Sequence, residues 1–273
     1  MYEQLRTSTH LDTFTGVSPT EPHESNEKVQ PGASELLPLN PEGRVFSNTR
    51  RVSIDDCDPI GRMEFDAIAR FLQDVGNDDT DDGGFGALGL AWVARRALIR
   101  VEVPAQAREE LTLSTWCSGT GRRWAERRTS ITGSLGAKVD AVTTWIHLDP
   151  ETGRPVPWGD EFATLYLPAS KGRRVDARLR LPKAPESNGD SMPWSFRATD
   201  SDAYGHVNNA AYLALAEEFL DLGGPRTLEI EWRTPCHAGD ELTAIVAPGT
   251  GLLHLIDDAT SDTRAVISTR TTS

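Results

Sequence analysis

Apolar residues recur at helical spacing behind a polar turn in residues 199–218, TDSDAYGHVNNAAYLALAEE. The side chains that share one helix face are Tyr212, Leu215, Ala216, Phe219 and Leu222. This i, i+3, i+4, i+7 spacing predicts a helix that packs on a core and extends to residue 222. The turn holds Asp202 and His206, and Asn208 and Asn209 can cap the helix. We therefore expect a carboxylate, an imidazole and a helix N-terminus, whose N–H groups can polarise a carbonyl, to lie together.

An earlier stretch, residues 55–75, repeats this turn and this apolar face at a constant offset of 144. The matched pairs are Asp56/Asp200, Asp58/Asp202, Gly61/Gly205, Arg62/His206, Ile68/Tyr212, Phe71/Leu215, Leu72/Ala216 and Val75/Phe219. Farther along, residues 103–112 match residues 234–243 at an offset of 131. A shared offset in both turn and helix face predicts an internal repeat. The alternative is two unrelated capped helices, because turns favour Asp and Gly in any protein.

Alternating apolar and polar positions predict antiparallel strands around these helices. The expected strands lie at residues 44–54, 98–116, 127–133 and 139–149, near Trp194, and near 252–257 and 264–270. The aspartate- and glycine-rich residues 77–89 are expected to form a flexible surface loop. Its insertion in the first repeat alone explains why the offset falls. A long helix with a strongly bent antiparallel sheet, present twice, is an α+β arrangement.

Composition divides the chain into four segments. Residues 1–43 are rich in proline and acids, lack an apolar period and are expected to be a disordered tail. Residues 44–167 and 194–273 carry the two repeats as an N-terminal and a C-terminal domain. The charged residues 168–193, rich in Pro, Gly and Ser, are expected to link the two domains.

Charge and cysteine content narrow the classes of function. A net charge of −13 argues against nucleic acid as a partner, because phosphate binding favours a basic surface. The three cysteines are far apart and form no CxxC pair, so neither zinc nor a disulfide framework is indicated. Reduced thiols fit a cytoplasmic location, and no stretch approaches the ~20 apolar residues of a membrane span. The aspartates of residues 77–89 lack the spacing of a calcium loop, so we expect no metal site.

The motif D-x-x-G-H-V-N-N-x-x-Y at residues 202–212, on a strand, turn and helix, resembles the hot-dog thioesterases. DCDPIG at residues 56–61 is similar to the hydroxybenzoyl-CoA thioesterase branch, and residues 110–157 resemble the corresponding region of acyl-acyl-carrier-protein (acyl-ACP) thioesterases. The resemblance covers roughly residues 44–270. It implies two tandem hot-dog domains, each a long central helix wrapped by a curved antiparallel sheet, which join as a pseudo-dimer. It also implies hydrolysis of a fatty acyl thioester without a cofactor.

The functional residues of the family carry over only in part. Its motif holds Asp, Asn and His at alternate positions, and Asp202 and His206 match, whereas Tyr204 stands at the Asn position. The family's later Cys matches Cys236, but Pro235 replaces the Glu before it. Asp202 and the helix N-terminus remain, and these are the features on which the simpler hot-dog enzymes rely.

Thioester hydrolysis needs a nucleophile or an activated water, and donors that hold the oxyanion. We expect Asp202 to attack directly or as general base, with His206 and Asn208 as the other catalytic candidates. The alternatives are a turn-forming aspartate and a helix-capping asparagine. The residues expected to contact substrate are Tyr204, Gly205, Val207, Asn209, Asp58 and Gln73. Cys236 is expected to be a buried strand residue.

The expected partners are thioesters of acyl carrier protein or of coenzyme A. Acyl carrier protein is acidic, so its binding needs a local basic patch. The candidate basic residues are Lys171, Arg173, Arg174, Arg178, Arg180 and Lys183, with Arg122, Arg123, Arg127 and Arg128 as a second cluster. The other functions left open are a hot-dog lyase and a non-catalytic acyl-binding protein. A homodimer of pseudo-dimers is compatible with the sequence.

Overall fold

A computed structural model describes residues 36–39, 42–85, 91–185 and 189–272. The expected tail, residues 1–43, and the last part of the expected loop lie largely outside these ranges. Ten strands of the described chain form one sheet in which every neighbouring pair is antiparallel. The strands are β1 (Phe46–Arg51), β2 (Ala91–Val103), β3 (Glu110–Thr120), β4 (Trp124–Gly133), β5 (Lys138–Leu148), β6 (Asp190–Trp194), β7 (Arg226–Trp232), β8 (Leu242–Ala247), β9 (Leu252–Asp257) and β10 (Thr263–Thr271).

The sheet repeats one strand order in its two halves. Its order is β1-β3-β4-β5-β2-β7-β10-β9-β8-β6. The first half runs inward from its edge as β1, β3, β4, β5 and β2. The second half runs inward from the other edge as β6, β8, β9, β10 and β7, which is the same order of strands. The halves join where β2 pairs with β7, from Arg96 opposite Glu231 to Val101 opposite Arg226. The internal repeat expected from the sequence is therefore present in the strand order.

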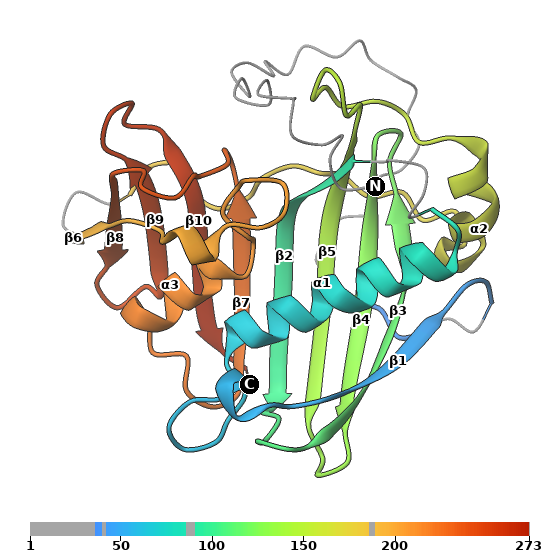
Figure 1. The fold of residues 1–273 in the computed structure, drawn as a ribbon, viewed down its shortest axis with the longest axis horizontal. Helices are drawn as coiled ribbons and strands as arrows, with labels where there is room; N and C mark the ends of the chain where they lie inside the picture. Colours follow the sequence, from blue (N-terminus) through green and yellow to red (C-terminus); the bar gives the residue numbers. More distant parts are fainter. Residues whose placement is uncertain (1–35, 40–41, 86–90, 186–188, 273) are drawn as a thin grey trace.

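Two helices lie on the same face of the sheet (Figure 1). Helix α1 (Phe65–Asp82) crosses the first half, and α3 (Ala211–Phe219) crosses the second. The strands alternate beneath them, because successive side chains of a strand point to opposite faces. Leu113 of β3, for example, is fully buried between two more exposed neighbours and belongs to the core cluster that also includes the helix residues Ile68 and Leu215. None of the described helices is both long and apolar enough to cross a bilayer.

The lengths of both helices differ from expectation. Helix α1 continues through most of the acidic stretch that was expected to be a loop, as far as Asp82. Asp79, only 1% exposed, is held there by Arg44 and Arg127, each 2.6 Å from one of its carboxylate oxygens. Helix α3 has nine residues and ends at Phe219, not at residue 222. Two glycines and a proline at residues 223–225 follow closely, and such residues do not extend a helix.

The chain between the halves is more ordered than its composition predicts. An unexpected helix, α2 (Asp160–Ser170), packs against β3. The chain then crosses the sheet face opposite α1 and α3, where its backbone meets side chains of the second half. The N–H of Leu181 donates to Glu231 Oε1 (3.0 Å), and Thr263 Oγ1 donates to the carbonyl of Lys183 (2.7 Å). The strand expected to begin near Trp194 is β6, which ends at that residue.

Two of the expected strand boundaries were also wrong. Residues 98–116 belong to two strands, β2 and β3, separated by a turn at residues 104–109. Arg108 in that turn has a φ of 69°, and Glu109, 1% exposed, accepts the backbone N–H of Gln106 (2.9 Å). A strand cannot continue through a residue with positive φ, so the alternating pattern breaks there.

Candidate active site

The two predicted turns have the same backbone hydrogen bonds. In the second turn the N–H of Asp202 donates to the carbonyl of His206 (2.9 Å), and the N–H of Gly205 donates to the carbonyl of Asp202 (3.0 Å). In the first turn, Asp58, Arg62 and Gly61 form the matching pair of bonds, at 2.8 and 2.9 Å. The repeat thus extends to individual hydrogen bonds at the offset of 144.

Asp202 is partly buried, and the exposed residues of the second turn, 203–205, follow it. Its Oδ1 accepts the N–H of Tyr204 (2.9 Å), which is the Asx bond of a turn-forming aspartate. The Tyr204 side chain is 79% exposed. Gly205 has a φ of +81°, and an added Cβ would meet no atom within 4 Å, so the left-handed backbone explains the glycine. His206 lies beside His237, with 5.1 Å between the ring centroids.

Asn208 joins the second turn to the other half of the chain. Its N–H donates to the carbonyl of Asp200 (2.8 Å), and its Oδ1 accepts the N–H of Ala210 (2.9 Å) in the turn before α3. The N-cap of α3 is Ala210, so the expected capping by an Asn208 or Asn209 side chain is wrong. The same Oδ1 accepts a hydrogen bond from Gln73 Nε2 of α1 (3.0 Å), and Asn208 Nδ2 donates to Gln73 Oε1 (3.4 Å). The structure therefore brings Gln73 to the predicted site. Asn209 is partly buried next to this pair.

Val207 and Cys236 belong to the packing beneath the turn. Val207 is 4% exposed, and its N–H donates to the carbonyl of Cys236 (2.9 Å). Cys236 is fully buried, and its N–H donates to the hydroxyl of Tyr212 (3.1 Å). Burial raises the pKa of the Cys236 thiol to about 11. Because the thiolate is the reactive form, this cysteine is not suited to act as a nucleophile.

Asp58 lies away from Asp202, in the first turn, where Arg62 engages it. Its Oδ1 accepts the N–H groups of Ile60 (3.0 Å) and Arg62 (2.9 Å), and its Oδ2 accepts Arg62 Nε (2.8 Å). Burial acts to raise the pKa of the Asp58 carboxyl, but the hydrogen bonds from Arg62 outweigh it and lower the pKa overall. Asp58 is therefore held as a carboxylate by its own turn.

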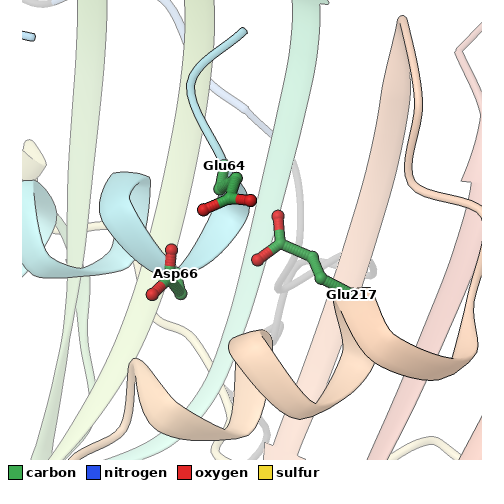
Figure 2. A group of neighbouring side chains, drawn as sticks. All are labelled: Glu64, Asp66 and Glu217. Atoms are coloured by element: carbon green, nitrogen blue, oxygen red, sulfur yellow. The ribbon is translucent and has the colours of Figure 1, made fainter. Parts of the chain in front are cut away.

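A cleft of about 170 Å³ opens beside this first turn, at the N-terminus of α1. It is lined by Asp58, Arg62, Met63, Glu64, Phe65, Val101, Pro104, Glu217, Leu222, Gly223 and Gly224. Figure 2 shows the carboxyl groups of Glu64, Asp66 and Glu217 gathered there, the last from α3. One oxygen from each of the three lies within 4.8 Å of the others. The N–H of Phe65 donates to Glu217 Oε1 (2.6 Å).

Two carboxyl groups of this cleft have a raised pKa. Burial, together with the neighbouring Asp66 and Glu64, raises the pKa of Glu217 to about 8 against the effect of the Phe65 N–H. Burial also raises the pKa of Glu64. Among the described residues only these three carboxyls are close enough together to hold a metal ion. Asp66 is paired with Arg70, however, and Glu217 accepts a backbone N–H, so we do not identify a metal centre.

Two family models match the chain. The acyl-ACP thioesterase N-terminal domain matches residues 43–166, and the acyl-ACP thioesterase C-terminal domain matches residues 184–270. Together they cover more than half of the chain. The chain belongs to the acyl-ACP thioesterase family. It is a thioester hydrolase, which excludes the lyase and the non-catalytic binding protein as leading functions.

Similar proteins of this thioesterase family have been solved. The 12:0-ACP thioesterase from Umbellularia californica is 20% identical, with a TM-score of 0.67 over 83% of this chain and 97% of its own. An acyl-ACP thioesterase from Bacteroides thetaiotaomicron is 16% identical, with a TM-score of 0.66 over 83% of this chain and 98% of its own. These likenesses show the hot-dog fold. An uncharacterised protein of Mycobacterium tuberculosis is 27% identical over 205 residues, 74% of this chain and 82% of the relative.

Sequence reasoning missed three residues near the two turns of this thioesterase. His237 was not among the candidate residues, yet its ring lies next to that of His206. Glu64 and Glu217 were not singled out. The repeat contained the signal for both, because an offset of 144 links Glu64 with Asn208 and links Gln73 with Glu217. The amide pair at one turn and the carboxyl pair at the other therefore occupy corresponding positions.

Proposed function

We propose that this chain hydrolyses fatty acyl thioesters of acyl carrier protein, releasing free fatty acid and the carrier thiol. The observation that carries the site assignment is the amide pair of Gln73 and Asn208. It fastens the middle of α1 to the start of α3, directly behind the turn that holds Asp202 and His206. Residues from both halves thus converge at the turn where we propose the chemistry.

Asp202 is the acid–base or nucleophilic group in this proposal. As a nucleophile, its carboxylate adds to the thioester carbonyl carbon, the thiolate leaves with a proton, and water cleaves the resulting anhydride. As a general base, it takes a proton from water, whose oxygen adds to the same carbon. In both routes the N-terminus of α3 stabilises the oxyanion. His206 protonates the leaving thiolate, and Tyr204, Gly205, Val207 and Asn209 line the path of the substrate.

The basic residues give less support to carrier-protein docking than their number indicated. Arg127 is paired with Asp79, Arg128 with Asp140, and Arg173 with Glu126. Ion pairs within the chain therefore account for much of both clusters. Lys171 also pairs with Glu42 (3.2 Å), whereas the exposed Lys183 remains as a candidate to meet an acidic partner. The same positive charges suit the phosphates of coenzyme A, so the substrate test must include both carriers.

We further propose that the halves are two tandem hot-dog domains, with boundaries at residues 44–167 and 194–273 and a link at 168–193. The mirrored strand order and the matching turns support this division. A homodimer of such pseudo-dimers and a cytoplasmic location complete the proposal. Light scattering of the purified chain distinguishes a mass near 29.9 kDa from twice that value.

The experiment that tests the function is thiol release from matched acyl-ACP and acyl-CoA substrates of several chain lengths. Wild type is compared with Asp202→Asn and with Asp262→Asn, an exposed aspartate in the loop before β10 that serves as the matched control. We expect faster release from the carrier protein, a loss of at least 100-fold in kcat for Asp202→Asn, and no change in the control. Faster release from coenzyme A reassigns the substrate. Full activity in Asp202→Asn contradicts the site assignment.

A further inference from the structure

The cleft at the N-terminus of α1 corresponds, within the repeat, to the proposed site at α3. Gly61 has a φ of +84° where Gly205 has +81°, and the two turns form the same hydrogen bonds. Glu217 of α3 reaches the first turn of α1 as Gln73 of α1 reaches the start of α3. The cleft is thus built from both halves of the chain, as the proposed site is.

The chemical groups at the two positions differ in one decisive respect. An amide pair, such as Gln73 with Asn208, can hold a water or a carbonyl but cannot take a proton. A carboxyl pair, such as Glu217 with Glu64, can. In the turn beside the carboxyl pair, Asp58 is engaged by Arg62 through both of its oxygens, so it is not available as a base. In the α3 site the proposed proton acceptor, Asp202, lies in the turn, whereas in this cleft the group that can accept a proton is Glu217 of the opposite helix.

The cleft adds an observation that is independent of the acidic side chains. Its wall is partly apolar, with Met63, Phe65, Val101, Pro104 and Leu222 among its lining residues. A pocket with an apolar wall and a few converging polar groups is the usual form of a small-molecule site. Its base is the start of an 18-residue helix, where the backbone N–H groups and the helix dipole favour negative charge.

We propose that this cleft is a second thioester-hydrolysing centre, in which Glu217 takes the proton from the attacking water. The inference rests on the proposed function, because it assumes that acyl thioesters are the substrates. Water oxygen bonds to the carbonyl carbon, and the water proton passes to the Glu217 carboxylate. The carbon–sulfur bond then breaks, and the thiolate takes a proton from the carboxyl of Glu217 or Glu64. The products are a carboxylic acid and a thiol, with no other reactant.

The charges around Glu217 set the pH at which this centre works. Glu64, which precedes α1, and Asp66 of α1 face it, and the nearby Arg62 and Arg70 pair with Asp58 and Asp66. The pKa of Glu217 is about 8, so its basic form increases from pH 7 to pH 9. Hydrolysis at this centre should rise about 10-fold over that range and level off above it.

The test compares pH–rate profiles of the full chain, of Asp202→Asn, and of Asp202→Asn combined with Glu217→Gln or with Glu218→Gln, each with acyl-ACP and acyl-CoA. Glu217→Gln still accepts the Phe65 N–H but cannot take a proton, and Glu218→Gln makes the same change at an exposed neighbour. Asp202→Asn removes the proposed base of the other site. Because the second centre supplies only the activity that persists in Asp202→Asn, we expect that residual activity to rise near pH 8, and adding Glu217→Gln should remove the rise and at least 100-fold of the residual activity. Adding Glu218→Gln should keep the profile of Asp202→Asn.

The outcomes separate this inference from the proposed function. An unchanged profile when Glu217→Gln is added to Asp202→Asn, or complete loss of activity in Asp202→Asn alone, overturns the second centre and leaves the α3 site standing. If wild type hydrolyses neither substrate, the proposed function itself fails. If Glu217→Gln lowers activity only in proportion to its folded fraction, measured by circular dichroism, the residue is a structural cap and the inference is wrong.

Discussion

Replacing Glu217 by Gln should change how the stability of the fold depends on pH. The unfolded chain exposes this carboxyl, whose ordinary pKa is 4.5, whereas burial raises its pKa in the fold to about 8. Between these values the folded state binds a proton that the unfolded state has released. Folding is therefore favoured below pH 4.5 and loses stability as pH rises to 8. The slope is about −1.4 kcal/mol per pH unit, or about 5 kcal/mol in total.

The neighbouring Glu64 carboxyl reduces the loss of stability that can be assigned to Glu217. Burial also raises the pKa of Glu64, so the two groups compete for the same protons and the loss assigned to Glu217 alone is about 2–5 kcal/mol. Glu217→Gln keeps the hydrogen bond from Phe65 without a charge. It should match wild type at pH 4.5 and exceed it in unfolding free energy by about 2 kcal/mol or more at pH 8.5.

Urea denaturation at half-unit steps from pH 4.5 to 9 measures this difference directly, because linear extrapolation gives the unfolding free energy at each pH. Glu218→Gln, an exposed neighbour with the same chemical change, should track wild type throughout. Parallel curves for wild type and Glu217→Gln would refute the reasoning, since they would mean that this carboxyl titrates alike in the folded and unfolded chain.

Three further predictions concern the helices and the buried thiols. Asp79→Asn should lower the unfolding free energy by about 3–5 kcal/mol, because it breaks a buried ion pair. Asp82→Asn, at a carboxylate 58% exposed, should lower it by less than about 1 kcal/mol. Equal effects of the two substitutions in urea denaturation would contradict this prediction. Gln73→Leu should leave Asn208 Nδ2 without its partner, costing about 1–3 kcal/mol in denaturation and lowering kcat/KM. A fully active, equally stable variant would exclude the amide pair from the site. Alkylation of the native protein at pH 8 should leave Cys236 unmodified, because burial raises the pKa of its thiol to about 11. Mass spectrometry detects the modification. A Cys236 that is alkylated as fast in the native protein as in urea would refute its burial.

The turns and the repeat could be predicted because their causes are local. A glycine at positive φ and an aspartate that binds its own backbone act within five residues, so Asp58 to Arg62 and Asp202 to His206 carry the same signal wherever they occur. The alternation of the strands is equally local. These signals led from the sequence to the two-fold strand order without any knowledge of which residues touch.

The end of α1 could not be predicted, because its cause lies far away in the chain. Four aspartates followed by glycines are typical of a loop, and aspartate is a poor helix former. Three of them, however, meet cations from outside the helix: Arg50 pairs with Asp78, Arg44 and Arg127 pair with Asp79, and Arg44 also pairs with Asp82. Tertiary ion pairs thus extend the helix by two turns beyond its local preference.

The candidate site could be predicted in its turn but not in its pairing across the halves. The sequence placed Asp202 and His206 together because they share a turn, yet the group that each turn faces comes from the other helix. An internal repeat provides a rule for finding such groups, because a contact between position i in one repeat and j in the other implies its mirror image at the same offset. Applied to Gln73 and Asn208, this rule leads to Glu217 and Glu64, where amides are replaced by carboxyls. After duplication the two positions have kept one geometry, and the change from amide to carboxyl is enough to give each a different acid–base chemistry.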